Sequence, residues 1–156
     1  MKIEWKKLLI ALGIPLAVGG LSALLSGGMT DYGVMNKPPL SPPGWVFPVV
    51  WTILYLAMGY ASWRVYTKEE NPGQRRLSLG LYLAQLLLNF LWPIVFFRFQ
   101  AFLAAFAVLL ILWILIVMTM WQFYKSDERA GDLLIPYLLW VTFAGYLNLG
   151  VYLLNG

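Results

Sequence analysis

The side chains best able to do chemistry in this sequence are amides and aromatic rings that share one face of an apolar helix. In the segment 77–97, Gln85 and Asn89 lie four residues apart, so a helix would place both amides on one stripe. An amide exposed to lipid has no hydrogen-bond partner, so both should point inward. Two interpretations stay open, namely hydrogen bonds between helices and polar contacts to a ligand. The whole stripe comprises Tyr82, Gln85, Asn89, Trp92 and Phe96.

Two other apolar segments carry similar stripes. One has Trp51 and Tyr55 in helical register, and the other has Trp140, Ala144 and Asn148, with Phe143 beside them. Three inward faces that mix aromatic rings with a few polar groups are typical of a pocket for a flat, largely apolar ligand. Generic core packing is the alternative for the two tryptophans.

The missing residue types exclude several chemistries. The chain has no His and no Cys, which rules out haem ligation by His, the usual zinc sites and triad hydrolysis. Tyr and Met can ligate iron, but no spacing selects them. The sequence also has no Gly-rich phosphate loop, nucleophile elbow or carboxylate pair. We therefore expect no metal and no cofactor, and whether the protein is an enzyme stays open.

Composition indicates a membrane protein. Hydrophobic residues make up 61% of the 156 residues and charged residues only 12%, about half the usual share of a soluble domain. A soluble fold of this size cannot bury so much apolar surface, so most of it should face lipid. The net charge of +4 is better explained by membrane topology than by binding of nucleic acid.

Five apolar segments are long enough to cross a bilayer, which predicts an all-α five-helix bundle in one domain, residues 1–156. A proline-rich loop at 27–44 precedes the second segment and should be extended and stiff. Asp132 is expected to cap the last helix. The predicted spans are 8–26, 45–66, 77–97, 101–124 and 132–154.

Charge placement predicts the orientation. With five spans, only Lys37 and Arg98 fall on the side opposite the N-terminus. By the positive-inside rule the N-terminus is cytoplasmic and the proline loop is extracytoplasmic. No charged residue is expected inside a span, which disfavours ion-coupled transport. The basic residues on the N-terminal side are Lys2, Lys6, Lys7, Arg64, Lys68, Arg75, Arg76, Lys125 and Arg129.

Two further patterns concern the lipid-facing surface. Small residues at Gly13, Ala17 and Gly20 share a face that permits close helix approach, so we expect a homodimer. Tryptophans near span ends are typical of an interfacial belt. That interpretation applies to Trp5, Trp45, Trp63 and Trp121.

Three stretches together resemble the signature of the translocator protein family, also called TspO, tryptophan-rich sensory protein or peripheral benzodiazepine receptor. The resemblance covers essentially the whole chain and, with no His or Cys, fits a bacterial member in the cell membrane. The stretches are KPPLSPPGWVFPVVWTILYLAMGY, GLYLAQLLLNFLWPIVFF and PYLLWVTFAGYLNLGVY.

This resemblance implies a receptor or sensor that is commonly dimeric and binds porphyrins such as protoporphyrin IX, or benzodiazepine and isoquinoline-carboxamide ligands. By matching position, Trp51 and Trp140 would be pocket tryptophans, Asn89 and Asn148 polar contacts, and Ala144 a small residue in the pocket. Tyr32 and Pro42 would belong to a lid over it. Mitochondrial members end in a Tyr followed by a basic residue, which Asn155 and Gly156 replace here, so sterol binding is disfavoured.

Two alternative functions remain. Light- and oxygen-dependent porphyrin degradation, proposed for bacterial members, would make Trp51 and Trp140 catalytic through tryptophan oxidation. Transport of tetrapyrroles or sterols requires alternating access, and no inverted repeat or broken-helix pair supports it.

Overall fold

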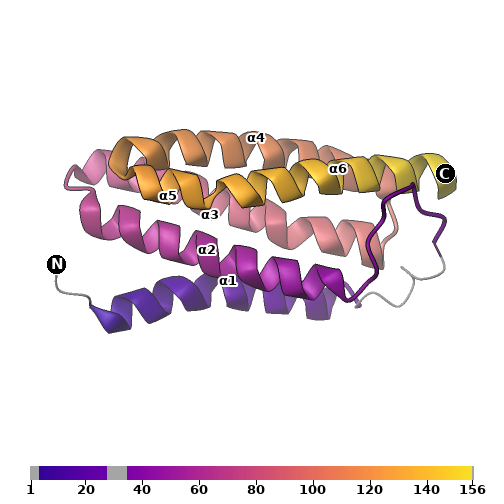
Figure 1. Ribbon diagram of the computed structural model, residues 1–156, viewed down its shortest axis with the longest axis horizontal. Coiled ribbons are helices and arrows are strands. Elements are labelled where there is room, and N and C mark those ends of the chain that lie inside the picture. The colour runs from indigo at the N-terminus through magenta and orange to yellow at the C-terminus, as the bar shows by residue number, and fades with distance from the viewer. Residues whose placement is uncertain (1–3, 28–34, 156) are drawn as a thin grey trace.

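The chain forms a bundle of long, nearly parallel and antiparallel helices, with its two termini at opposite ends (Figure 1). The computed structural model describes residues 4–27 and 35–155, so the predicted lid residue Tyr32 lies outside the described residues. The helices are α1 (Trp5–Leu25), α2 (Val46–Lys68), α3 (Pro72–Pro93), the π-helix η2 (Ile94–Arg98), α4 (Phe102–Ser126), α5 (Glu128–Leu133) and α6 (Ile135–Asn155).

Five helical segments in the described part of the chain are long and apolar enough to cross a membrane. They are α1, α2, α3 with η2, α4, and α5 with α6. This confirms the predicted all-α, five-span class, and the protein is a multi-pass membrane protein. Each of these five segments is longer than the bilayer core requires at 1.5 Å per residue, so the ends reach the polar interface.

The central helix is α2 and the peripheral helix is α1. Ten residues of α2 are buried, whereas only Leu8, Pro15 and Ser22 are buried in α1. In the middle of their contact, a Cβ added at Gly59 would lie 2.6 Å from the carbonyl oxygen of Ala11. Glycine at this position therefore lets the two backbones approach each other closely.

Polar side chains fix the ends of the helices away from the proline loop. Asn71 caps α3 by accepting hydrogen bonds from the backbone N–H groups of Gly73 and Gln74. Asp127 caps α5 by accepting one from Ala130. The prediction that Asp132 caps the last helix is wrong, because α5 begins before it and its carboxylate accepts a hydrogen bond from Tyr124 instead.

A buried charged residue lies inside a span, which corrects the sequence-based expectation. Arg64 is buried in α2, and its Nε donates to Oδ2 of Asp127 at 2.5 Å. Lys68, one turn further along, contacts the same carboxylate at 3.3 Å. Burial raises the pKa of the Asp127 carboxyl, but the hydrogen bonds from Arg64 and Lys68 outweigh it and leave this pKa below its usual value.

The tryptophans assigned to an interfacial belt separate into two groups. Trp5, Trp45 and Trp121 are well exposed on the outside of the bundle, as a belt requires. Trp63 is buried with only 5% of its surface exposed. Its assignment to the belt is therefore wrong, because its ring lies under α1 rather than in the interface.

Candidate functional site

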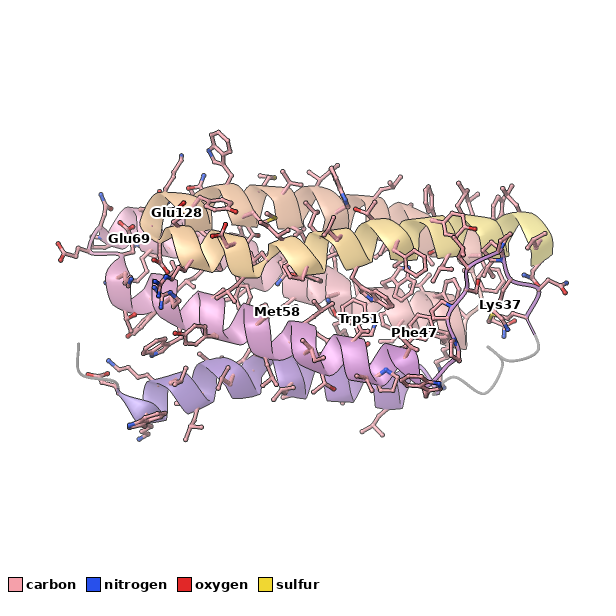
Figure 2. All side chains as sticks on the ribbon, viewed as in Figure 1. Lys37, Phe47, Trp51, Met58, Glu69 and Glu128 are labelled. Carbon is pink, nitrogen blue, oxygen red and sulfur yellow. The ribbon has the colours of Figure 1, made fainter. Side chains whose placement is uncertain are left out.

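A cavity of about 370 Å³ lies between α1, α2 and α3 in the half of the bundle near the proline loop. Figure 2 shows Phe47 and Trp51 toward the end where Lys37 lies, with Met58 in the middle of the bundle. This volume is within the range of small-molecule sites. We call it the loop-end cavity. Its walls are Leu16, Gly19, Gly20, Ser22, Ala23, Ser26, Phe47, Pro48, Trp51, Thr52, Tyr55, Trp92, Pro93 and Phe97.

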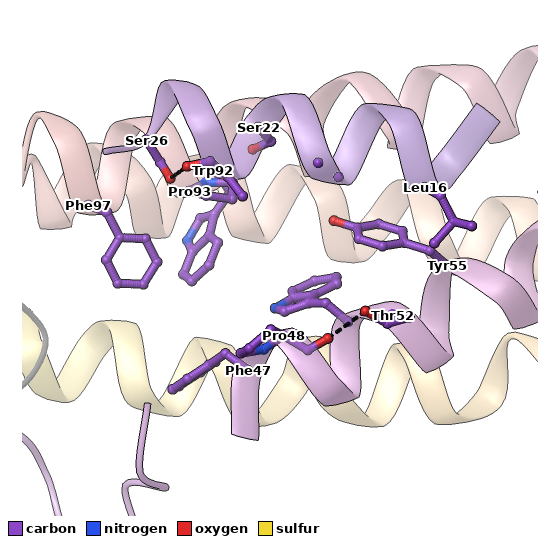
Figure 3. Close-up of a pocket in the computed structure, with 14 residues that line it drawn as sticks. Leu16, Ser22, Ser26, Phe47, Pro48, Thr52, Tyr55, Trp92, Pro93 and Phe97 are labelled. Atoms are coloured by element: carbon purple, nitrogen blue, oxygen red, sulfur yellow. Dashed lines mark hydrogen bonds between the residues drawn. The ribbon is translucent and has the colours of Figure 1, made fainter. Parts of the chain in front are cut away.

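Aromatic rings of α2 face those of α3 and η2 across this cavity. Figure 3 shows Trp92 and Phe97 on one side and Phe47 and Pro48 on the other, with Tyr55 at one end. The Trp51 ring stacks on Tyr55 with centroids 5.5 Å apart. Rings that present their faces and edges at such distances offer stacking surfaces to a flat ligand.

The serine and threonine hydroxyl groups in the wall are already engaged with backbone carbonyls. Ser22 donates to the carbonyl of Phe90 at 2.8 Å. Ser26 donates to the carbonyl of Ala23 and Thr52 to that of Pro48 (Figure 3). None of the lining residues is charged. The described wall is therefore predominantly apolar and aromatic, and it would hold a ligand mainly through shape and stacking.

Close packing of α1 against α2 shapes the inner end of the cavity. A Cβ added at Gly19 would lie 2.1 Å from the ring of Tyr55. Only glycine leaves room for this ring, which in turn places the Tyr55 hydroxyl at the polar centre of the bundle. Gly19 was not among the residues predicted for the site, although its place on a small-residue face of the first span is the signal that points to it.

The predicted amides Gln85 and Asn89 join helices rather than line the loop-end cavity. Tyr55 donates to Oδ1 of Asn89 at 2.8 Å, and Nδ2 of Asn89 donates to the hydroxyl oxygen of Tyr137 at 2.7 Å. Tyr137 then donates to Oε1 of Gln85 at 2.6 Å. This chain of hydrogen bonds connects α2, α3 and α6, which is the interhelical arrangement left open by the sequence.

The predicted residues Ala144 and Asn148 face a second, much smaller void of about 20 Å³. Asn148 accepts a hydrogen bond from Nε1 of Trp92 at 2.9 Å and donates to the carbonyl of Phe102 at 2.8 Å. Phe47, Trp92 and Phe97 line both this void and the loop-end cavity. These three rings therefore form the partition between the two spaces.

Trp140 lies behind that partition. Its ring meets the edge of Phe47 at 5.8 Å between centroids, and with Phe143 it lines a hollow on the outer surface of α2 and α6. The structure thus brings Trp51, Tyr55 and Trp92 together in one cavity wall. Trp140 and Phe143 belong to a neighbouring hollow, and Phe47 separates Trp140 from the cavity.

The described part of the proline loop packs against the C-terminal end of α6. Pro39 accepts a hydrogen bond from the Tyr146 hydroxyl at 2.5 Å, and a Cβ added at Gly150 would lie 2.4 Å from Pro38. Asn36 and Asn155 exchange two hydrogen bonds. The predicted lid residue Pro42 is half-buried in this loop but is not part of the cavity wall.

The π-helix η2 supplies a site residue that sequence periodicity missed. After Pro93 the backbone widens, and Phe99 donates to the carbonyl of Ile94, five residues earlier. This register places Phe97 in the cavity wall, while Phe96 stacks on Trp92 in the core. A proline followed by a short aromatic run is the local signal, but a regular helix of 3.6 residues per turn does not predict the shift.

Five membrane-spanning helices around an aromatic cavity, with a proline loop packed across one end, define a class of small helical membrane proteins. Comparison with known proteins agrees with this class. The model of the TspO/MBR family matches residues 11–154. The chain therefore belongs to the TspO/MBR family, whose members carry the names of sensory and translocator proteins.

Its relatives include bacterial and animal proteins. It is 40% identical to the tryptophan-rich sensory protein of Cereibacter sphaeroides over 99% of this chain and 95% of that protein. It is 38% identical to the tryptophan-rich protein TspO of Chlorobaculum tepidum over 95% of each chain. The translocator protein of Bos taurus is 36% identical over 78% of this chain and 72% of its own length.

Proposed function

We propose that this TspO/MBR family protein is a membrane receptor or sensor for a flat, largely apolar ligand, with porphyrins such as protoporphyrin IX as the leading class. Benzodiazepine and isoquinoline-carboxamide compounds have the same aromatic character. The observation that carries the proposal is the loop-end cavity, whose wall combines Trp51, Tyr55 and Trp92 with no charged side chain. Stacking supplies the affinity, and the small residues of α1 leave room for the ring.

The test is a titration of the purified protein with protoporphyrin IX in the dark. Trp51→Phe should weaken binding about two- to tenfold, the range expected for one aromatic contact. Trp140→Phe should have a smaller effect because Phe47 stands between it and the cavity. The matched control is Trp121→Phe, which changes an outward-facing indole. Unchanged affinity in a folded Trp51→Phe variant would remove the cavity from the proposal.

A second candidate function is oxidative breakdown of the bound porphyrin in light. The observation that favours it is the stacked pair of Trp51 and Tyr55 at the cavity wall, two oxidisable rings beside the ligand position. Aerobic illumination of the complex should then yield a discrete bilin-like product that Trp51→Phe abolishes. Bleaching at the rate of protoporphyrin IX in detergent alone would leave binding as the only function.

The proposal includes a cellular orientation and an oligomeric state. We place the protein in a bacterial cell membrane with a cytoplasmic N-terminus and an extracytoplasmic lid loop, on the charge asymmetry of the sequence. A homodimer is supported by Gly13 and Gly20, because Cβ atoms added there would meet nothing within 4 Å. Crosslinking in native membranes that gives only monomer would contradict the dimer.

A further inference from the structure

A second cavity of about 340 Å³ lies in the other half of the bundle, again between α1, α2 and α3. We call it the N-end cavity, because α1 contributes residues near its start, including Lys7, Ile10 and Ile14. Gly59 separates the two cavities along α2, because its close approach to α1 lies between Tyr55, the last α2 residue of the loop-end cavity, and Ser62, the first of the N-end cavity. The N-end cavity is therefore a site of its own.

The rim of the N-end cavity is apolar and open to the lipid-facing surface. Ile10 is 53% exposed, Ile14 42% and Leu83 56%, whereas Tyr82 in the wall is only 4% exposed. A hydrocarbon chain lying against this rim would bury apolar surface on both partners. The cavity extends inward from the polar end of the bundle, because it begins at Lys7, two residues after the start of α1.

Two polar atoms buried in this wall have no hydrogen-bond partner among the described residues. They are Nε1 of Trp63 and the hydroxyl of Tyr82. The neighbouring hydroxyl of Ser62 donates to the carbonyl of Gly59. Unpaired buried donors cost free energy, so an occupant that brings oxygen acceptors would stabilise the site. A purely hydrocarbon occupant would leave both donors unpaired.

Positive charge surrounds the polar end of the cavity. The Lys7 ammonium lies 5.4 Å from the centre of the Tyr66 ring, and the Arg75 guanidinium lies 5.3 Å from the same ring. Lys7 also pairs with Glu4 at 2.8 Å, but both side chains are at least half exposed, and such a pair is weak. An anionic headgroup at this level would therefore meet two cations.

We infer that the N-end cavity binds one acyl chain of an anionic glycerolipid from the surrounding bilayer. The acyl chain lies against Ile10, Ile14 and Leu83, and the headgroup phosphate lies beside Lys7. The ester carbonyls, which occupy the interface below the headgroup, supply the acceptors that Trp63 and Tyr82 lack. The inference is independent of porphyrin binding, because the loop-end cavity shares no lining residue with this one.

The test is native mass spectrometry of the full-length protein titrated with phosphatidylglycerol and, separately, with phosphatidylcholine of the same acyl chains. Lys7→Gln should lower phosphatidylglycerol affinity about fivefold, the effect of one cation at a membrane surface, and lower phosphatidylcholine affinity less, because choline offsets the charge of the phosphate that both lipids carry. Tyr82→Phe should weaken both lipids about threefold through one lost hydrogen bond. Protoporphyrin IX affinity should stay at the wild-type value in both variants.

Matched controls decide the outcome. Lys6→Gln removes a neighbouring charge outside the cavity, and Tyr152→Phe removes a hydroxyl on α6. If Lys7→Gln and Tyr82→Phe bind both lipids as these controls do, the lipid adducts are non-specific and the inference is overturned. Equal losses for both lipids in Lys7→Gln would also overturn it, because the cation would then not be selecting a lipid with a net negative headgroup.

Discussion

The side of the bundle formed by α3, α4 and α6 differs from the side covered by α1. Hydrogen bonds join the first side, where Asn89 links Tyr55 to Tyr137 and Asn148 links Trp92 to the start of α4. On the second side, α1 meets α2 through glycine contacts, and hydrogen bonds join its C-terminal end to α3 at Ser22 and to Arg98 of η2 at Leu25. Both large cavities under α1 lie on this second side.

The difference suggests that one side of the bundle serves as a scaffold and the other side holds the binding sites. Amides in a bilayer find partners on neighbouring helices and produce a fixed scaffold. Helix α1 instead packs on its neighbours mainly through small residues. Small side chains leave volume unfilled and form no polar contacts, so cavities remain beside α1. Binding sites should therefore be found under α1, and the hydrogen-bonded side should contribute to stability without taking part in binding. Three substitutions, in order from the largest expected effect to the smallest, and one pH dependence test this division.

The largest effect is expected from Arg64→Leu, which breaks the ion pair joining α2 to α5. Removing the guanidinium leaves the enclosed Asp127 carboxylate with Lys68 as its one remaining cation, and we expect the free energy of unfolding to fall by about 3 kcal/mol, the lower end for a buried pair. Arg76→Leu is the matched control, because Arg76 is exposed and only donates to a backbone carbonyl. The measurement is thermal or denaturant unfolding in detergent.

The same pair gives a pH dependence. The pKa of Asp127 is lower in the folded protein than in the unfolded chain, where it is about 4. The carboxylate therefore contributes fully to stability above that unfolded-state pKa, and the contribution is lost as pH falls through the folded-state pKa. In Arg64→Leu the carboxyl loses its main donor, so its pKa should rise and the loss of stability should begin at a higher pH. If the free energy of unfolding falls with pH in the same way in wild type and variant, the pKa of Asp127 does not depend on Arg64.

A smaller effect is expected from Gly59→Ala, which tests the contact between α1 and α2. The added Cβ would lie 2.6 Å from a backbone oxygen, so α1 must shift, at a cost of about 1–3 kcal/mol. Gly80→Ala is the control, since a Cβ there meets nothing within 4 Å, and its better helix propensity should stabilise by up to about 1 kcal/mol. Changes of opposite sign in the free energy of unfolding of the two variants would support the contact, whereas equal changes would contradict it.

Sequence reasoning predicted the five spans because long apolar runs punctuated by charge are a strong signal. It also gave both possible roles of Asn89 and Gln85 without deciding between them, since a stripe at helical spacing shows which face is inward but not what lies opposite. Phe97 was missed because η2 shifts the register after Pro93. Trp63 was assigned to the interface because its position near a span end does not reveal that α1 covers it.

The smallest effect is expected from Asn89→Leu, and it separates scaffold from site most directly. The change removes two interhelical hydrogen bonds, each worth about 0.6 kcal/mol in a membrane protein, so unfolding should become easier by about 1 kcal/mol. If Asn89 serves only the scaffold, protoporphyrin IX should bind with unchanged affinity, because the residue does not line the loop-end cavity.

Asn155→Leu is the matched control near the C-terminal end of α6, where the lost partner is Asn36 of the loop. A large loss of affinity with little loss of stability would reverse the assignment, placing Asn89 in the ligand site and extending the cavity into the hydrogen-bonded side of the bundle.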